Sequence, residues 1–567
     1  MKNPYKAAIC GILAIIMVFL LTACPKEQET AKTRTEREII EGVGFDTPEG
    51  AVLEYLDALS NADVARMMSV FAIESYSHDF KAALSQTGTF STWTAPLPNV
   101  NGFVKAMNIE NRRNKAAISV FRQNRNLRMS DLDSLPPSLL WESGPGIREA
   151  VKLSRDKTEI STLVASVKQY LSSLPLATLK VLGFIPLEAL NDYVPEGSRK
   201  YWENEFDTRG AQIRAGKLTG CVALFELGEN KYLFCPDVVN YEGKWYIEQL
   251  NGSIVSSLFS DMDMTALKKS EGILPLPNEL YLDYFAMLVP IITEPNLPGI
   301  RKSGSGKAEG EGFDSSEEAV TAYLDAFKDA DFERMISTFA IESFVENIDI
   351  ESYLYNFGYF QPWGPIFLDD SDFEQAMNVE WRRNWVAESI SAKYRHLCLC
   401  DPDSLPDPNY LAPSGDVLYA KLEVGKNKRE VSTFTKWISK YLTALPLNTL
   451  KLHGFIPRKS LEESLLSKSD LETIEKEENS RAERIGAGSL FGCVALFELD
   501  GDLFLFTPDT VCYEGKWFIC SLGGDTSRKL LGNLGFSIDE YVSGGIIHLA
   551  NENIYNYLFG LINLDSF

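Results

Sequence analysis

Two segments of the chain repeat one pattern of apolar runs and turn residues. Residues 220–247 and 492–519 read GCVALFELGENKYLFCPDVVNYEGKWYI and GCVALFELDGDLFLFTPDTVCYEGKWFI, and 19 of the 28 aligned residues are identical. In each segment two turns separate three apolar runs, and Asp500-Gly501 has the composition of a two-residue type I′ hairpin. The pattern predicts a three-stranded antiparallel meander in each half of a duplicated chain.

Each meander is preceded by two patterns of helical period. In the first copy Thr47 and Pro48 are typical of a helix start, apolar residues follow at helical spacing, and Asp63 is positioned to cap a second helix. The second copy repeats this from Ser315 and Asp331. We therefore expect a pair of short helices at the start of each copy.

The helix pair and the closing G-K-W-[YF]-I strand together resemble the nuclear transport factor 2-like superfamily, whose cystatin-like α+β fold packs helices against a curved antiparallel sheet around an internal pocket. The resemblance implies an α+β protein with two tandem copies of such a helix-packed sheet, each with a helical insert and a helical tail. It implies no activity, because this superfamily includes enzymes, receptor-like domains and many bacterial lipoproteins. The inserts also make each copy much longer than the minimal domain of the family.

The first residues of the chain have the pattern of a secretion signal. Lys2 and Lys6 precede a mainly apolar run over residues 7–23, and Leu21-Thr22-Ala23-Cys24 resembles the bacterial lipobox. The resemblance implies cleavage before Cys24 and acylation of its sulfur, which would anchor the mature protein to a bacterial membrane outside the cytoplasm. The alternative is an uncleaved anchor helix, although a run of 17 residues is short for crossing a bilayer.

These patterns divide the chain into five expected parts. They are a lipoprotein signal peptide (1–23), a tether (24–41), a first α+β repeat domain (42–293), a linker rich in Pro, Gly and Ser (294–311), and a second α+β repeat domain (312–567). We expect each repeat to fold by itself and the two to pair internally, sheet against sheet.

Charge narrows the possible partners. The chain has 55 Lys and Arg against 79 Asp and Glu, and removal of residues 1–23 takes away two lysines and no acid, which leaves 53 − 79 = −26. Such a surface disfavours nucleic acid and anionic headgroups, so attachment to a membrane should depend on the lipid at Cys24. We expect no nucleic-acid partner and no cofactor.

Two arginine pairs stand at the same place in both copies. Arg112-Arg113 and Arg382-Arg383 each follow a glutamate, Glu110 or Glu380 respectively. An arginine fork suits a carboxylate or a phosphate, so these four arginines are candidate ligand-binding residues. The alternative is a solvated helix face on which each arginine pairs with the glutamate of its own helix.

Two carboxylates interrupt the apolar strands of the meanders. Glu226 and Glu498 would share a strand face with apolar residues, so they are candidate ligand-binding or acid/base groups with a raised pKa if that face lines a pocket. Both stand near a hairpin turn, so an exposed position at the end of a strand is the alternative. Asp237 and Asp509 allow the same two interpretations.

The cysteines and histidines give weaker signals. Seven cysteines remain beyond the lipidation site, an odd number, and we expect no disulfide framework, although a Cys221–Cys235 bridge across one hairpin is conceivable. His396, Cys398 and Cys400 would share a face if their segment were a strand, as metal ligands could. The first copy has no equivalent set, so we expect no metal.

The sequence favours a membrane-anchored envelope lipoprotein that acts as a ligand-binding or protein-interaction module, with a small molecule or an envelope protein as its partner. One alternative is an envelope hydrolase or isomerase that uses a pocket carboxylate such as Glu226 or Glu498. Another is a structural component of an envelope assembly. Whether the interior of each copy is open or filled by side chains should separate these hypotheses.

Overall fold

The computed structural model divides the chain into two units, Met1–Arg37 and Glu38–Phe567. It describes residues 39–79, 89–91, 99–128, 151–152, 175–192, 196–254, 271–276, 285–290, 307–351, 359–360, 372–399, 421–423, 445–457, 467–523 and 545–549, with a few isolated positions between them. The expected signal peptide and Cys24 lie outside these ranges. Within them, no helix combines the length and the apolar character needed to span a membrane.

Helices begin where the capping residues predict. Thr47 Oγ1 accepts a hydrogen bond from Gly50 N at 3.1 Å, and Asp63 Oδ1 accepts one from Arg66 N at 3.0 Å. The helices of the first half (residues 39–290) are α2 (Pro48–Ser60), α3 (Val64–Ser69), α4 (Glu74–Asp79), α5 (Gly102–Arg128) and α7 (Glu196–Gln212).

The second half (residues 307–549) repeats these helices in the same order. Ser315 and Asp331 cap the first two of them, as Thr47 and Asp63 do in the first half. The helices are α11 (Ser316–Lys328), α12 (Phe332–Ser337), α13 (Glu342–Asn347), α15 (Asp372–Leu399) and α18 (Lys468–Arg484).

The expected three-stranded meander is instead four strands shared between two antiparallel sheets. The second apolar run breaks at Pro236 in the first half and at Pro508 in the second, because proline has no N–H to continue a ladder. In the first half these two sheets consist of β3 (Lys180–Phe184), β4 (Lys217–Gly220), β5 (Ala223–Leu227), β6 (Asn230–Phe234), β7 (Asp237–Tyr241), β8 (Lys244–Gln249), β9 (Ile273–Pro275) and β10 (Val289–Pro290).

The sheet orders of the two halves correspond. They are β10-β3-β5-β6-β9 and β4-β7-β8 in the first half, and β13-β15-β16-β19 and β14-β17-β18 in the second. In the second half these two sheets consist of β13 (Lys451–Phe455), β14 (Ser489–Gly492), β15 (Ala495–Leu499), β16 (Asp502–Phe506), β17 (Asp509–Tyr513), β18 (Lys516–Ser521) and β19 (Ile546–His548). Asp500 and Gly501 both have positive φ, as the predicted turn requires.

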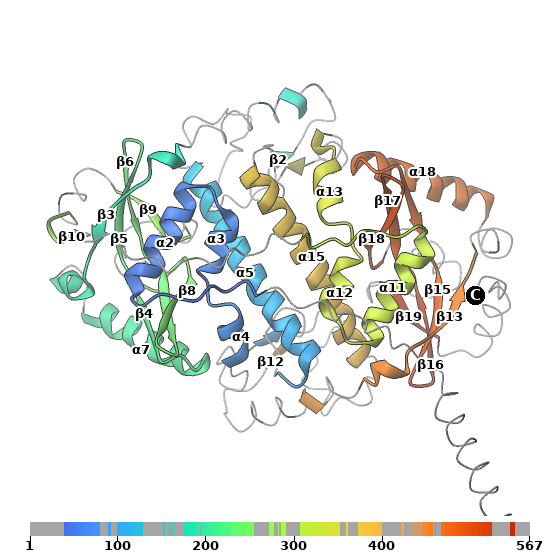
Figure 1. Ribbon diagram of the computed structural model, residues 1–567, viewed down its shortest axis with the longest axis horizontal. Coiled ribbons are helices and arrows are strands. Elements are labelled where there is room, and N and C mark those ends of the chain that lie inside the picture. The colour runs from blue at the N-terminus through green and yellow to red at the C-terminus, as the bar shows by residue number, and fades with distance from the viewer. Residues whose placement is uncertain are drawn as a thin grey trace, which may run out of the picture. The chain divides into compact units, whose positions relative to one another are not determined.

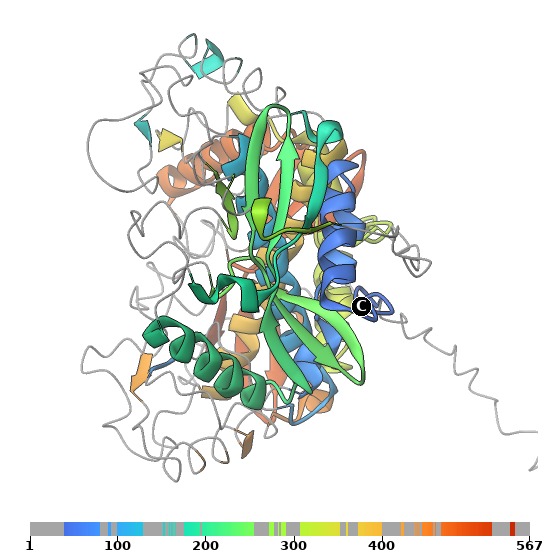
Figure 2. The same ribbon diagram turned by 90° about the vertical axis from the view of Figure 1, so that its left-hand side faces the viewer.

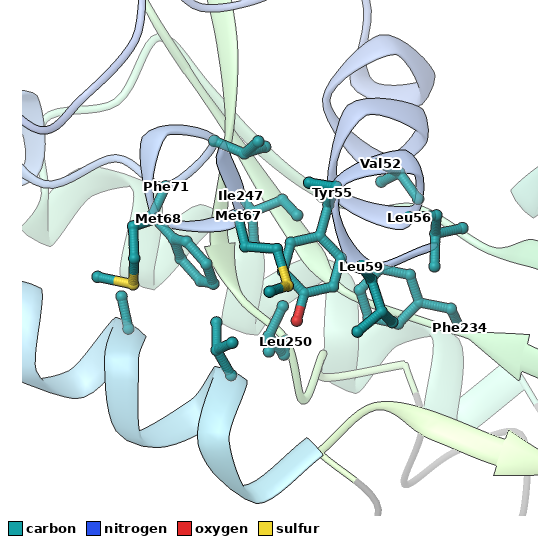
Figure 3. Close-up of a cluster of buried hydrophobic side chains, with 14 of the residues drawn as sticks. Val52, Tyr55, Leu56, Leu59, Met67, Met68, Phe71, Phe234, Ile247 and Leu250 are labelled. Atoms are coloured by element: carbon teal, nitrogen blue, oxygen red, sulfur yellow. The ribbon is translucent and has the colours of Figure 1, made fainter. Parts of the chain in front are cut away.

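Aromatic side chains fill the space between the first helix and the sheets of each half. Tyr55 meets Phe71 edge to face, with ring centroids 6.0 Å apart, and stacks on Phe234 at 5.4 Å. Figure 3 shows these rings packed together with Leu59, Met67 and Leu250. In the second half, Tyr323 makes the corresponding contacts with Phe339 and Phe506.

Helices cover both sides of the first-half sheets. Figure 2 shows α2 (blue) on one side of the strands and α7 (green) on the other. In β5, Phe225 belongs to the hydrophobic cluster that contains α2 residues, whereas Leu224 belongs to the cluster that contains Trp202 and Phe206 of α7. Both faces of this strand are therefore buried.

The two halves meet mainly through their long helices. Figure 1 shows α5 and α15 side by side. Two short sheets also pair strands of different halves, with β1 (Thr89–Ser91) against β12 (Lys421–Glu423) and β11 (Tyr359–Phe360) against β2 (Val151–Lys152). Helix packing is thus the principal contact between the described residues of the two halves. The sequence had led us to expect the sheets to pack against each other.

Each long helix inserts its first turns into the core of the other half. Phe103 at the start of α5 packs against Phe327, Phe332 and Tyr394, with ring centroids 6.2, 5.5 and 4.8 Å away. Phe373 and Met377 near the start of α15 likewise belong to the core of the first half. Each hydrophobic core is therefore built from both halves of the chain.

The folded body also begins earlier in each half than the sequence indicated. Glu41, assigned to the tether, is buried and accepts hydrogen bonds from the backbone N–H groups of Ile73 and Ser75. Glu309, assigned to the linker, does the same with Ile341 and Ser343.

Candidate functional site

The paired arginines of α5 and α15 point in different directions because successive residues of a helix are about 100° apart. Arg112 donates from Nε to the Ala72 carbonyl at 2.9 Å and from Nη2 to the Glu248 carbonyl, with its guanidinium 4.0 Å from the centroid of the Tyr76 ring. The side chain thereby joins α5 to the residues before α4 and to β8. These contacts give it a structural role.

Arg382 makes the equivalent contacts in the second half. It donates to the carbonyls of Ala340 at 3.0 Å and Cys520 at 2.7 Å, and its guanidinium lies 4.1 Å from the Phe344 ring and 4.7 Å from the Trp385 ring. Burial lowers the pKa of Arg382 from its usual value. Its direct contacts are thus carbonyl oxygens and aromatic rings.

The second arginine of each pair bonds to the glutamate of the other half. Arg113 donates from Nε to Glu380 Oε2 at 2.8 Å and from Nη2 to Glu380 Oε1. Arg383 donates to both oxygens of Glu110, at 3.3 and 3.2 Å. Each ion pair thus joins the two helices. The sequence had suggested pairing within one helix.

The arginine pairs also differ from expectation in their exposure. All four arginines are at least nine-tenths buried. The alternative interpretation from sequence, a helix face in contact with solvent, is therefore wrong for these residues. Glu333 is a further partner of Arg383, at 2.8 Å. Burial by itself lowers the pKa of Arg383. The carboxylates of Glu110 and Glu333 outweigh this effect and raise that pKa above its usual value.

Glu226 and Glu498 lie near the ends of β5 and β15. Glu226 is partly exposed and stands opposite Lys180 on one neighbouring strand and Lys231 on the other. Glu498 is 36% exposed, and its Oε2 lies 3.0 Å from His453 Nε2. Neither carboxylate belongs to the aromatic interior beside Tyr55 or Tyr323.

Asp237 and Asp509 are buried, and each pairs with an arginine that sequence reasoning missed. Arg209 Nη1 donates to Asp237 Oδ2 at 2.6 Å, and Arg481 Nη1 donates to Asp509 Oδ2 at 2.6 Å. In both halves the two residues are 28 positions apart. That equal spacing was the one signal in the sequence that could have identified the pairs.

The buried charge beside Arg209 is not repeated in full. Glu248 bonds to Arg209 Nη2, but the corresponding residue of the second half is Cys520. A carboxylate of the first half is thus replaced by a thiol. The arginine–aspartate pair occurs in both halves whereas the Glu248 carboxylate does not, which favours a structural role for the pair.

The cysteine and metal hypotheses also have structural outcomes. Cys221 and Cys235 are free thiols that belong to two different hydrophobic clusters. His396 and Cys398 lie in helix α15, not in a strand, so a spacing of two does not place them on one face; Cys400 lies outside the described residues. No group of three or more potential metal-binding side chains occurs in the part of the chain that the structure describes.

Comparison with known proteins gives a likeness of structure alone. No family model matches the chain, and no curated protein matches it. The chain is similar to the crystal structure of a cystatin-like protein from Ruminococcus gnavus ATCC 29149, with 13% sequence identity and a TM-score of 0.49 over 90% of this chain and 94% of the other. Its function must therefore be inferred from its own residues.

Proposed function

We propose that the mature chain is a lipoprotein of the bacterial envelope, held outside the cytoplasm by acyl chains on Cys24. The support is the order of Lys2 and Lys6, the apolar run and the Leu21–Cys24 motif in the sequence. Two acyl chains hold a protein stably at a membrane, whereas the acidic body should not bind anionic headgroups.

We further propose that the body is a tandem duplication in which two cystatin-like units form an internal pair. The matching order of helices, sheets and capping residues supports this, as do the reciprocal bonds of Arg113 to Glu380 and of Arg383 to Glu110. One chain would thus hold an arrangement that other proteins obtain from two subunits.

The function that these features support best is binding, to a ligand or to another envelope protein, without catalysis. The observation that carries this proposal is the packing of Tyr55 and Tyr323 against aromatic rings, because those rings occupy the interior where an enzyme of this architecture would hold its substrate. Glu226 and Glu498 stand away from that interior, so the hydrolase hypothesis loses its carboxylates.

An exposed apolar surface is a suitable place to test for a partner. Leu282 is 67% exposed, and Phe285 and Val289 are each 49% exposed. A photo-crosslinking residue at position 282, introduced into the full chain in living cells, should give discrete adducts, whereas the same residue in place of Lys468, which is 92% exposed on α18, should give none. Equal results at both positions would contradict the proposed binding function.

A further inference from the structure

The junction of α5 and α15 is less symmetric than its reciprocal ion pairs suggest. Arg383 bonds to two carboxylates, those of Glu110 and Glu333. Arg113 bonds to one, that of Glu380, and its Nη1 is buried without a hydrogen-bond partner. A buried donor left without an acceptor is destabilising, because its hydrogen bond to water is lost and not replaced.

A single difference between two corresponding helices accounts for the second carboxylate at Arg383. Helices α3 and α12 are equally long, begin after Asp63 and Asp331 and align without a gap, which places Ala65 at the position of Glu333. Ala65 is exposed, so the first half lacks the carboxylate at a place that solvent reaches.

We propose that the position beside Ala65 binds a carboxylate from outside the chain, which accepts a hydrogen bond from the Arg113 guanidinium as Glu333 does from Arg383. The second half contains a precedent, since the Glu333 carboxylate lies 2.8 Å from Arg383 Nη2. Guanidinium groups favour carboxylates because the bond is charge-assisted. This inference rests on the proposed binding function and names a ligand class for it.

A second polar side chain at the same junction lacks partners. Asn384 lies one helical turn beyond Glu380 on α15, is buried, and has no partner for either atom of its amide. Its counterpart Asn114 donates to Glu388, whereas Ile118 stands where the first half would need that acid. The junction of α5 and α15 therefore has a second difference in polar contacts between the halves.

Nearby charges limit the strength of binding. Glu110 and Glu380 attract the Arg113 guanidinium, Arg383 repels it, and Glu388 bonds to the adjacent Asn114. Because carboxylates outnumber guanidinium groups here, we expect a weak site that takes one small monocarboxylate. A dianion would meet more repulsion.

Thermal unfolding of the detergent-solubilised full chain tests the site, with sodium acetate as the probe and sodium chloride at equal ionic strength as the reference. Acetate should raise the Tm by about 1–3 °C and reach saturation. Acetamide has the same shape without the charge and should have no such effect. If acetamide raises the Tm as much as acetate, the site accepts any polar group and the proposal is wrong.

Two matched variants separate this site from general effects of acetate. Ala65→Glu supplies the carboxylate from α3 itself, at an exposed position, so it should raise the Tm without acetate and abolish the response to acetate. Glu333→Ala should open an equivalent position in the second half and enlarge that response. A response that persists in Ala65→Glu would overturn the carboxylate site, while the crosslinking test of the proposed function would be unaffected.

Discussion

The Glu380 carboxylate on α15 accepts two hydrogen bonds from Arg113 on α5, a residue 267 positions earlier in the chain. Arg383 and Glu110 repeat this bond with the donor and acceptor helices exchanged. Next to these ion pairs, the first turns of each helix pack into the core of the opposite half. Polar and apolar contacts therefore connect the same two helices.

The buried ion pair should be costly to break. We expect Arg113→Ala to destabilise the chain by about 3–5 kcal/mol, because it leaves the Glu380 carboxylate, whose side chain is only 13% exposed, without this partner. The double variant Arg113→Ala/Glu380→Ala should lose less than the sum of the two single variants. Urea denaturation measures these differences.

A surface pair provides the control for this prediction. Lys244 and Asp46 lie 2.7 Å apart, but their side chains are 47% and 88% exposed. Lys244→Ala should cost less than about 1 kcal/mol. A similar loss at both sites would show that burial of the Arg113–Glu380 pair contributes little.

Truncation of Phe103, a residue of the first half, should destabilise the second half. Phe103→Ala removes a ring packed against Phe327, Phe332 and Tyr394, at a cost of about 3–5 kcal/mol. Hydrogen exchange measured by mass spectrometry should become faster in α11 and α12 than in α2 and α3.

The reciprocal variant serves as the control. Phe373→Ala should accelerate exchange in α2 and α3, because Phe373 belongs to the core of the first half. If each substitution instead accelerates hydrogen exchange only in the half that contains it, the packing of each helix start into the core of the other half is contradicted.

Stability should depend on pH through Glu271. Burial raises the pKa of this carboxyl to about 6, and Arg122, 3.7 Å away, offsets part of the effect. Since the folded pKa exceeds the unfolded value, the folded state binds the proton more tightly, and the contribution of Glu271 to stability rises as pH falls from 7 to 5. Glu271→Gln should flatten this part of the pH profile in urea denaturation, and an unchanged profile would exclude the role of Glu271.

Attachment to the membrane should depend on one thiol. Cys24→Ala should abolish the incorporation of a tagged fatty acid during growth, because the sulfur that receives the lipid is removed. In-gel detection of the tag measures this, with Cys221→Ala as a control that keeps its label. Labelling that survives the loss of Cys24 would exclude the proposed anchor.

The parts of the fold that depend on neighbouring residues were predictable from sequence. Capping by Thr47 and Asp63 and the Asp500-Gly501 turn are set by groups within a few positions of one another, and the structure confirms them. The break at Pro236 was also encoded locally, but the apolar run around it concealed the change of sheet. Local chemistry thus predicts elements better than it predicts their assembly into sheets.

The candidate site was less predictable, because its partners are distant in the chain. The sequence identified Arg113 and Glu380 as notable residues, yet each has a closer residue of opposite charge, Glu110 or Arg383, on its own helix. Only the packing of α5 against α15 decides between the two pairings. Likewise, the difference between Ala65 and Glu333 at corresponding positions could not be interpreted until the structure showed the buried arginines.

The shared cores are tested most directly by separating the halves. Residues 25–300 and 301–567 should be produced as two fragments, and thermal unfolding followed by circular dichroism should be compared for each fragment, for their mixture and for the intact body. We predict that neither fragment alone unfolds cooperatively at the Tm of the intact body, because each lacks the helix end that completes its core, and that mixing restores a cooperative transition. Two fragments that each unfold cooperatively at that Tm would contradict the account and restore the independent domains expected from the sequence.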